Sequence, residues 1–272
     1  RLGAGPASLR DLVDGKGSFF EKLKAAKNPL IVVGMGALAR QDGSAVLALA
    51  RALAEKLGAV RDDWNGFAVL HTAAARVGGL DLSLVPGEGG RDVAGILAGC
   101  ESGEIGAVYL LAADEIDTQR LGKAFVIYQG HHGDAGAHRA DVILPGATYT
   151  EKPGLYVNTE GRVQLGFRAG YPPGDAREDW AILRALSERL GRTLPYDTLD
   201  QVRSRLVAVN RCFAGLDQQQ AGAWGAFGRA GEVSDAPFLS PVANFYMTCP
   251  ISRASRTMAE CMATRAQAMA AE

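Results

Sequence analysis

The feature that most constrains the fold of this chain is a set of short apolar runs rich in β-branched residues. These runs cover residues 29–33, 107–111, 125–128 and 141–144, and glycine or proline follows all of them except 107–111. Continuous apolar runs of this length are typical of strands that are buried on both faces of a sheet. The sequence therefore predicts the buried strands of a parallel sheet.

Helical patterns precede the first run at residues 18–27 and follow it at residues 44–57, 67–77 and 95–102. The second pattern places Val46, Ala50, Leu53 and Leu57 along one stripe, and Gly58 follows as a natural end. Strands that alternate with helices imply βαβ units, because parallel strands need a crossover connection. We therefore expect an α/β fold with a Rossmann-like layered parallel sheet.

The character of the sequence changes after Pro172-Pro173-Gly174. Residues 178–190 predict a helix with Ile182, Leu183, Leu186 and Leu190 on one face, and residues 197–206 predict another that begins at Asp197 as its N-cap. We expect an α/β domain over residues 1–172, a helical region over 173–206 and a tail over 207–272.

The tail divides into a loose part and a terminal helix. Residues 207–244 contain Gln218-Gln219-Gln220 and many glycines and alanines, which predicts an extended, poorly packed segment. The helix expected from Ser252 onward places Ala254, Met258, Cys261 and Met262 on one soft apolar face. Such a face more often docks onto its own protein or a partner than binds a small molecule.

Length and charge exclude some classes of function. The 272 residues exceed the usual single domain of roughly 100–200, and the formal net charge is −1. This balance argues against a nucleic-acid or acidic-lipid surface. No signal peptide or long uncharged apolar run occurs, so we expect no membrane span. The chain begins Arg1-Leu2-Gly3 without an initiator methionine, and we expect a fragment of a longer polypeptide.

The four cysteines, Cys100, Cys212, Cys249 and Cys261, are all distant from one another in sequence. Iron–sulfur and zinc sites usually need paired thiolates a few residues apart, so that one loop supplies two ligands. We expect scattered reduced thiols of an intracellular protein and no metal site in this segment.

A glycine-rich turn follows the first predicted strand. The run from Gly34 through Gly36 to Ala39 loosely fits the dinucleotide pattern G-x-G-x-x-A. The following helix starts only near Asp42 or Ser44, and Asp62-Asp63 fall in a loop instead of ending a second strand. A tight strand-to-helix turn is therefore favoured, and a stand-alone nucleotide-binding module that uses Gly34 and Gly36 is one alternative.

Three histidines lie near one another in a glycine-rich loop and its continuation: His131, His132 and His138. Imidazoles are good ligands for zinc or iron, but no cysteine is near, and adjacent histidines point apart on an extended backbone. A polar loop at the carboxyl edge of the sheet is the favoured interpretation.

The stretch over residues 140–164, ADVILPGATYTEKPGLYVNTEGRVQ, is the most informative. It predicts a buried strand, a proline turn, and a loop that carries Glu151, Asn158, Glu160 and Arg162. These side chains could form hydrogen bonds and ion pairs with one another, or they could line the mouth of a pocket. Their residue types alone do not distinguish these two arrangements.

As a pattern, this stretch resembles the molybdopterin oxidoreductase family, in which A-D-x-x-L-P is followed by E-x-x-G and N-x-E-G-R-x-Q. The surrounding motifs resemble one branch of it, the large iron–sulfur subunits of respiratory complex I. These motifs are YQGHHGD at 128–134, REDW at 177–180, LPYDTLDQVR at 194–203 and ISRASRTMA at 251–259.

The resemblance implies a structural segment that has lost the molybdopterin cofactor, with [2Fe–2S] and [4Fe–4S] clusters held upstream. It implies no catalytic, cofactor-binding or metal residue within this segment. The partners implied are other peripheral-arm subunits of an assembly that passes electrons from NADH to ubiquinone and translocates protons. The implied location is peripheral, on the cytoplasmic face of a bacterial inner membrane or the matrix side of a mitochondrial one. An active molybdopterin enzyme such as a formate dehydrogenase is the other alternative.

Overall fold

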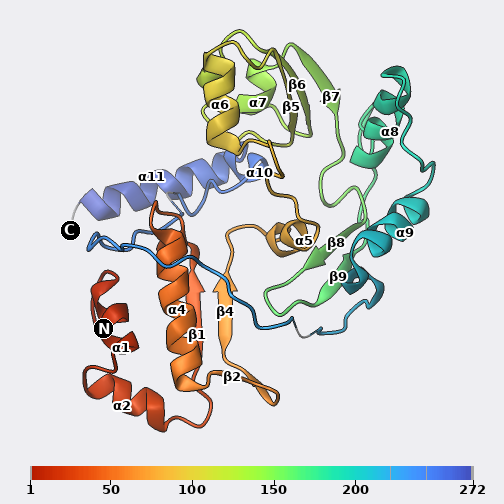
Figure 1. The fold of residues 1–272 in the computed structure, drawn as a ribbon. Helices are drawn as coiled ribbons and strands as arrows, with labels where there is room; N and C mark the ends of the chain where they lie inside the picture. Colours follow the sequence, from red (N-terminus) through yellow and green to blue (C-terminus); the bar gives the residue numbers. More distant parts are fainter. Residues whose placement is uncertain (1, 221, 243, 271–272) are drawn as a thin grey trace. The chain divides into compact units, whose positions relative to one another are not determined.

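The computed structural model describes residues 2–220, 222–242 and 244–270, and Figure 1 shows their helices and strands. The chain forms two compact units, each assembled from separate stretches. The first unit draws on Arg1–Val77, Val157–Arg162 and Gln218–Ala243, and the second on Gly78–Tyr156, Val163–Asp217 and Asn244–Glu272. The expected boundaries near 172 and 206 follow the character of the sequence and remain a prediction.

The first unit contains the first βαβ element. Strand β1 (Ile31–Gly34) pairs in parallel with β4 (Phe67–Leu70). The connection contains α3 (Met35–Leu38), α4 (Gly43–Leu57) and the short antiparallel pair β2 (Val60–Arg61) and β3 (Trp64–Asn65). The short helices α1 (Ala7–Val13) and α2 (Ser18–Ala25) precede it. The predicted stripe of α4 is confirmed, since Val46, Ala50 and Leu53 are buried, and Gly58 ends the helix in the left-handed conformation.

The prediction of a helix over residues 67–77 is wrong. Its first part is strand β4, and helix α5 (Arg76–Asp81) begins only where the prediction ends. Residues 67–70 form a continuous apolar run like the other strands, and the alanines at 73–75 favoured a helix on propensity alone. Pairing with β1 outweighs that weak propensity.

The second unit contains three parallel strands in the order β5 (Ala107–Leu111), β6 (Phe125–Gly130) and β7 (Val142–Pro145). These strands confirm the predicted apolar runs and the α/β class, but not the predicted burial on both faces: β7 is largely exposed because it is the edge strand of this sheet, and β5 is exposed at both of its ends. One face packs against α6 (Val93–Glu101) and the short helix η1 (Thr118–Leu121), and the core includes Leu97, Leu110, Leu121, Val126 and Tyr128. The connection from β6 to β7 contains α7 (Ala135–Arg139).

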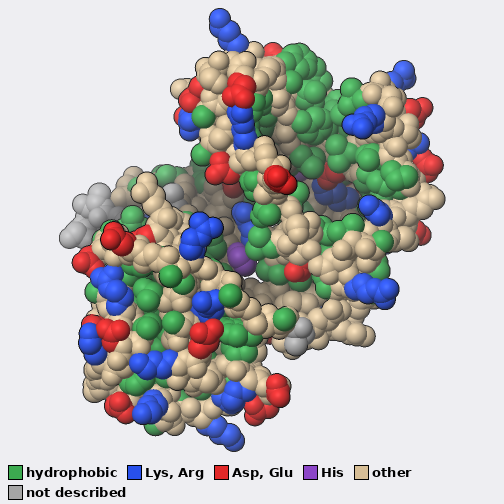
Figure 2. Space-filling view, viewed as in Figure 1, with side chains coloured by type: hydrophobic (Ala, Val, Ile, Leu, Met, Phe, Trp, Pro, Cys, Tyr) green, Lys and Arg blue, Asp and Glu red, His purple; other side chains and the backbone are tan. Residues whose placement is uncertain are grey.

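The opposite face of this sheet is only partly covered within the described residues, since Gln129 on this face is fully buried while other side chains are exposed. Leu111, Phe125 and Val142 share that face and are 47%, 47% and 39% exposed. Figure 2 shows apolar side chains gathered beside β6 and β7. Right-handed crossovers between strands in sequential order place every connection on one side of the sheet. On the other side, Asp179 contacts Gln129 near the carboxyl end of β6, so part of that side is also covered.

The predicted loop with the motif N-x-E-G-R-x-Q is instead a tight turn between two strands. Strands β8 (Gly154–Val157) and β9 (Val163–Gly166) form a two-stranded sheet. The Asn158 Oδ1 accepts the backbone N–H groups of Glu160 and Arg162, at 2.9 and 3.0 Å. Gly161 has a φ of 78°, which favours glycine. In this chain, Asn158 and Gly161 of the motif therefore stabilise a turn.

The two helices expected after residue 172 are present as α8 (Asp179–Arg189) and α9 (Leu199–Val209). The N-cap of α9 is Thr198 and not Asp197, because Thr198 and Gln201 form a reciprocal capping box. Leu190, expected on the apolar face of α8, is 70% exposed. A short helix, η2 (Arg211–Ala214), follows.

Residues 207–209 end α9 and residues 211–214 form η2, so the expected extended segment begins only after residue 214; most of its described residues are exposed, as expected of a poorly packed segment. Within the first unit, Trp224 and Phe227 pack against Phe67, each with ring centroids 5.3 Å from it. The chain continues to α10 (Pro250–Arg253) and α11 (Arg256–Ala270) in the second unit. Among the described helices, none has the length and apolar character needed to cross a membrane.

Candidate functional site

The glycine turn after β1 is covered by the chain itself. Residues 232–241, hereafter the strap, lie directly against it. A Cβ atom added to Gly36 would lie 2.1 Å from the backbone oxygen of Leu239, whereas one added to Gly34 would meet nothing within 4 Å. Gly36 therefore needs to be glycine because the strap approaches its backbone closely. Gly34 carries no such requirement.

A polar network holds the strap in the first unit. Arg40 Nη1 donates to the Ala236 carbonyl at 2.8 Å, and Arg40 Nη2 donates to Ser234 Oγ at 2.8 Å. The Ser234 N–H donates to Asp42 Oδ2 at 2.8 Å. Hydrogen bonds from Arg40 and from the Ser234 N–H hold the pKa of Asp42 well below its ordinary value.

The hollow beside this turn has a volume of about 490 Å³, and its walls come from both the turn and the strap. Its charged lining groups Arg40 and Asp42 already bond each other and the strap. The helix after the turn, α3, has only four residues, so it offers little of the long N-terminal dipole that binds phosphate groups. These residues do not fit the pyrophosphate of a dinucleotide or of a pterin cofactor.

The second unit brings three of the sequence motifs together in one hydrogen-bonded network. Gln129, which is fully buried on β6, donates from Nε2 to Asp179 Oδ1 at 2.7 Å. Lys152 forms an ion pair with the same Asp179, and the Tyr109 hydroxyl donates to Gln129 Oε1. The motifs YQGHHGD, TEKPG and REDW thus meet around a single carboxylate, and the network fixes the start of α8 against the sheet.

The histidine loop differs from the expectation that adjacent imidazoles point apart. The Nδ1 atoms of His131 and His132 lie 2.7 Å apart, because the backbone bends at this point instead of running extended. One ring must accept a hydrogen bond, so the two imidazoles cannot both be charged. Burial, followed by the neighbouring His132 and Lys152, lowers the pKa of His131. His138 lies separately, on α7.

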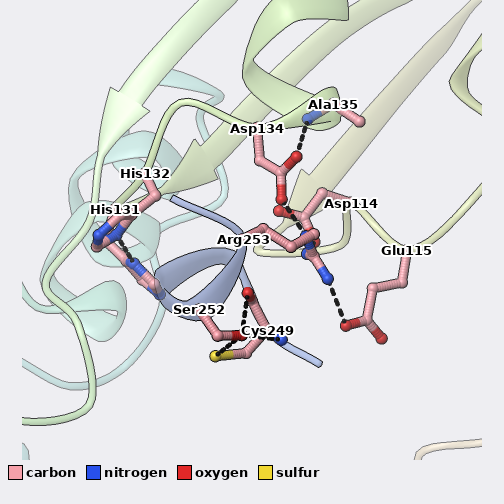
Figure 3. A network of polar contacts seen from close by, with 9 residues as sticks. All are labelled: Asp114, Glu115, His131, His132, Asp134, Ala135, Cys249, Ser252 and Arg253. Atoms are coloured by element: carbon pink, nitrogen blue, oxygen red, sulfur yellow. Dashed lines mark hydrogen bonds and ion pairs between the residues drawn. The ribbon is translucent and has the colours of Figure 1, made fainter. Parts of the chain in front are cut away.

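Carboxylates gather beside the histidines, at the carboxyl edge of the sheet (Figure 3). Asp114 and Glu115 follow β5, and Asp134 follows β6 as the N-cap of α7. Arg253 extends from α10 between these three side chains, which are hereafter the acid pocket. This cluster was not predicted from the sequence. Adjacent parallel strands end at one edge, so the two aspartates were predictable, but nothing in the sequence signals Arg253.

The cysteines do not form a ligand group. Cys100 is buried in the core of the second unit, and Cys249 lies beside the Ser252 hydroxyl at 3.3 Å. Hydrogen bonds from Ser252 lower the pKa of the Cys249 thiol. Across residues 2–220, 222–242 and 244–270, no three histidine, cysteine or acidic side chains converge in a way that could hold a metal ion.

Two family models match the chain. The model of the molybdopterin oxidoreductases matches residues 1–189. The model of the C-terminal region of the NADH-ubiquinone oxidoreductase G subunit matches residues 210–261. The second match covers the strap and α10, so the segment that covers the glycine turn is a characteristic region of that subunit.

Named relatives agree with these matches. The mitochondrial NADH dehydrogenase (ubiquinone) iron-sulfur protein 1 of Solanum tuberosum is 45% identical over 266 residues, which are 96% of this chain and 35% of the relative. The NADH-quinone oxidoreductase G subunit of Rickettsia bellii is 39% identical, and the NADH-ubiquinone oxidoreductase 75 kDa subunit of Reclinomonas americana is 40% identical. Both matches cover 96% of this chain, and they cover 37% and 38% of the relatives.

The chain thus spans little more than a third of the length of these curated relatives. The resemblance noted in the sequence is confirmed along both parts of the chain. Because one family model covers more than two thirds of its residues, this chain belongs to the molybdopterin oxidoreductase family, on the branch that carries the C-terminal region of the NADH-ubiquinone oxidoreductase G subunit.

Proposed function

We propose that this chain is a structural, cofactor-free portion of the large iron–sulfur subunit of respiratory complex I. The whole assembly would pass electrons from NADH through iron–sulfur clusters to ubiquinone and translocate protons. The clusters would be held by the rest of the polypeptide, and this portion would shield them and contact neighbouring subunits. It would lie peripherally, on the cytoplasmic face of a bacterial membrane or the matrix side of a mitochondrial one.

The observation that carries the cofactor-free part of this proposal is the strap over Gly36. In open α/β sheets, ligands bind outside the carboxyl ends of the strands. At β1 that space holds the Leu239 carbonyl, and Arg40 and Asp42 are engaged with Ser234 and Ala236. A bound pterin would have to displace the strap and break these hydrogen bonds.

Two surfaces support a role in assembly. The exposed part of the sheet face, with Leu111, Phe125 and Val142, is apolar, and parallel sheets are normally covered on both faces. Helix α11 keeps Met262 42% exposed, while Met258 and Cys261 are half-buried. Covering such surfaces would contribute roughly 25 cal/mol per Å² of apolar area removed from water.

The first test is a native gel of gently solubilised energy-transducing membranes, probed with an antibody against this chain and stained for NADH dehydrogenase activity. We expect the antibody signal and the activity in one very large band. A small species without NADH activity would contradict the assignment to complex I.

A second test addresses the docking role of α11. Deletion of residues 256–272 from the full-length subunit should reduce the amount of assembled complex, while the cluster signals per assembled complex stay unchanged in electron paramagnetic resonance. The matched control is Arg256→Gln, since Arg256 has a 93% exposed side chain and pairs only locally with Glu260 within α11. Normal assembly after the deletion would remove the docking role.

The alternative of an active molybdopterin enzyme, such as a formate dehydrogenase, is tested by metal content. Molybdenum or tungsten near one atom per full-length chain would favour that alternative. A stand-alone nucleotide module is tested by titration with NADH, and saturable binding that is lost in Gly34→Val would support it.

A further inference from the structure

We infer that the acid pocket formed by Asp114, Glu115 and Asp134 is a guanidinium-binding site, and that Arg253 occupies it as a tethered ligand. This inference goes beyond the structural role proposed above and does not depend on which assembly contains the chain. It concerns how the C-terminal helices are attached to the second unit.

The geometry uses the whole guanidinium group. Arg253 Nη2 lies 3.0 Å from Asp114 Oδ1, Nε lies 2.5 Å from Asp134 Oδ2, and Nη1 lies 3.3 Å from Glu115 Oε1. Each nitrogen therefore has its own carboxylate, as Figure 3 shows. A planar fork of five N–H donors matches this arrangement, whereas a lysine ammonium offers a single point of charge.

Burial makes the pocket dependent on a cation. The Asp114 side chain is only 1% exposed, and its Oδ2 is buried without a hydrogen-bond partner of normal geometry among the described residues. Burial raises the pKa of Asp114, and Arg253 opposes that rise. Burial and then the charge of Asp114 raise the pKa of the adjacent Tyr128 phenol to about 12, so this phenol stays neutral.

The pKa of Asp134 is shifted in the opposite direction from that of Asp114. Burial alone would raise the pKa of this carboxyl, but hydrogen bonds from Arg253 and from the Ala135 N–H lower it below its ordinary value. The pocket therefore holds several negative charges against one cation. Without that cation, a buried carboxylate would remain uncompensated, which is a strongly unfavourable state.

Arg253 is held in position by a short turn at residues 249–253. Helix α10 has only four residues, so its own helical hydrogen bonds fix little. The Cys249 N–H donates to Ser252 Oγ at 3.0 Å, and the Ser252 hydroxyl donates back to the Cys249 carbonyl at 2.9 Å. This turn presents Arg253 to the pocket. We infer that the ion pairs of Arg253 attach residues 249–262 to the sheet edge.

The experiment uses the full-length polypeptide and hydrogen exchange measured by mass spectrometry. In Arg253→Gln, amide exchange over residues 249–262 should rise by at least about tenfold, because breaking a buried charge pair is costly. Arg256→Gln is the control, and it should leave this exchange unchanged. Equal exchange in Arg253→Gln and the unmodified protein would overturn the inference.

Ligand binding to the emptied pocket is the second readout. Millimolar N-methylguanidinium should slow exchange over residues 109–117 and 128–138 in Arg253→Gln but not in the unmodified protein, whose pocket is filled. Tetramethylammonium at equal concentration controls for ionic strength and should have no effect. The same response to methylguanidinium in both proteins, or none in either, would contradict a guanidinium site.

A double variant covers the case in which Arg253→Gln disrupts the whole second unit. Exchange in α6, which packs on the core and not on the pocket, reports such disruption. Adding Asp114→Asn removes the uncompensated buried charge, so α6 should regain its protection while residues 249–262 stay labile. If α6 remains unprotected in the double variant, the pairing of Arg253 with Asp114 is not what stabilises the unit.

Discussion

The contrast between Gly34 and Gly36 gives the sharpest test of the strap. Both glycines fit the dinucleotide pattern, but only Gly36 has the strap against its backbone. In Gly36→Ala, the Leu239 carbonyl has to withdraw by about 1.3 Å to reach an ordinary contact of 3.4 Å from the new Cβ, which otherwise lies at 2.1 Å.

The expected change in the free energy of unfolding of Gly36→Ala is the difference between two opposing effects. Inserting a methyl group into a close-packed contact costs about 1–3 kcal/mol. Replacing glycine reduces the freedom of the unfolded chain and returns about 0.4–1 kcal/mol. Because the obstacle is backbone and not a flexible side chain, we take the upper part of the first range. The net loss is then about 2 kcal/mol for Gly36→Ala, whereas Gly34→Ala is neutral or slightly stabilising.

A loss of about 2 kcal/mol corresponds to roughly 30-fold faster exchange of amides that open with the strap. The reporter amides are Ser234, which donates to Asp42, and Phe238, which donates to the Ala4 carbonyl at 2.8 Å. The assay is hydrogen exchange on the full-length polypeptide with Gly34→Ala as the matched control. Equal effects of the two substitutions, or no change in strap exchange, would refute this account of Gly36.

Three further predictions concern the core, a helix cap and pH. Leu121→Ala should destabilise the second unit by about 2–5 kcal/mol because Leu121 is fully buried, whereas Leu111→Ala, at an exposed position, should cost far less. Hydrogen exchange of α6 measures both effects, and equal effects would contradict the assigned core. Thr198→Ala should destabilise α9 by about 1 kcal/mol, measured as faster exchange of the Gln201 amide. A larger effect from Asp197→Ala would show that Asp197 is the N-cap. The pKa of Asp42 is lowered from its ordinary 3.8, so its contribution to stability is present above that value and is lost as pH falls below about 4. The Ser234 amide, which donates to Asp42, should therefore lose protection from exchange on acidification, and loss on alkalinisation instead would contradict the sign.

Much of the sheet was predictable from local pattern. The run at 107–111 is continuously apolar, the runs at 125–128 and 141–144 each contain two β-branched residues, and Gly58 marks the end of α4. The prediction failed where local preferences were balanced. Residues 67–70 read as helix next to an alanine-rich stretch, and the turn at Asn158 read as a loop because its flanking strands are only four residues each.

The sequence motifs identified the family without explaining what their residues do. Gln129, Lys152 and Asp179 lie in three motifs separated along the chain, and only the fold places them in one hydrogen-bonded network. In the same way, the sequence left open whether Asn158 bonds its neighbours or lines the mouth of a pocket, and in the structure its side-chain oxygen closes a turn.

By itself, the sequence determined the α/β class, the parallel strands and the family, because all three depend on residues that are close in the chain or repeat at fixed spacing. Only the tertiary structure decided that Gly36 is covered by the strap and that Arg253 occupies the acid pocket. These contacts join residues about two hundred and more than a hundred positions apart, as Arg40 with Ser234 and Arg253 with Asp134 illustrate. No local pattern encodes such pairs, because which charges meet depends on the path of the chain between them.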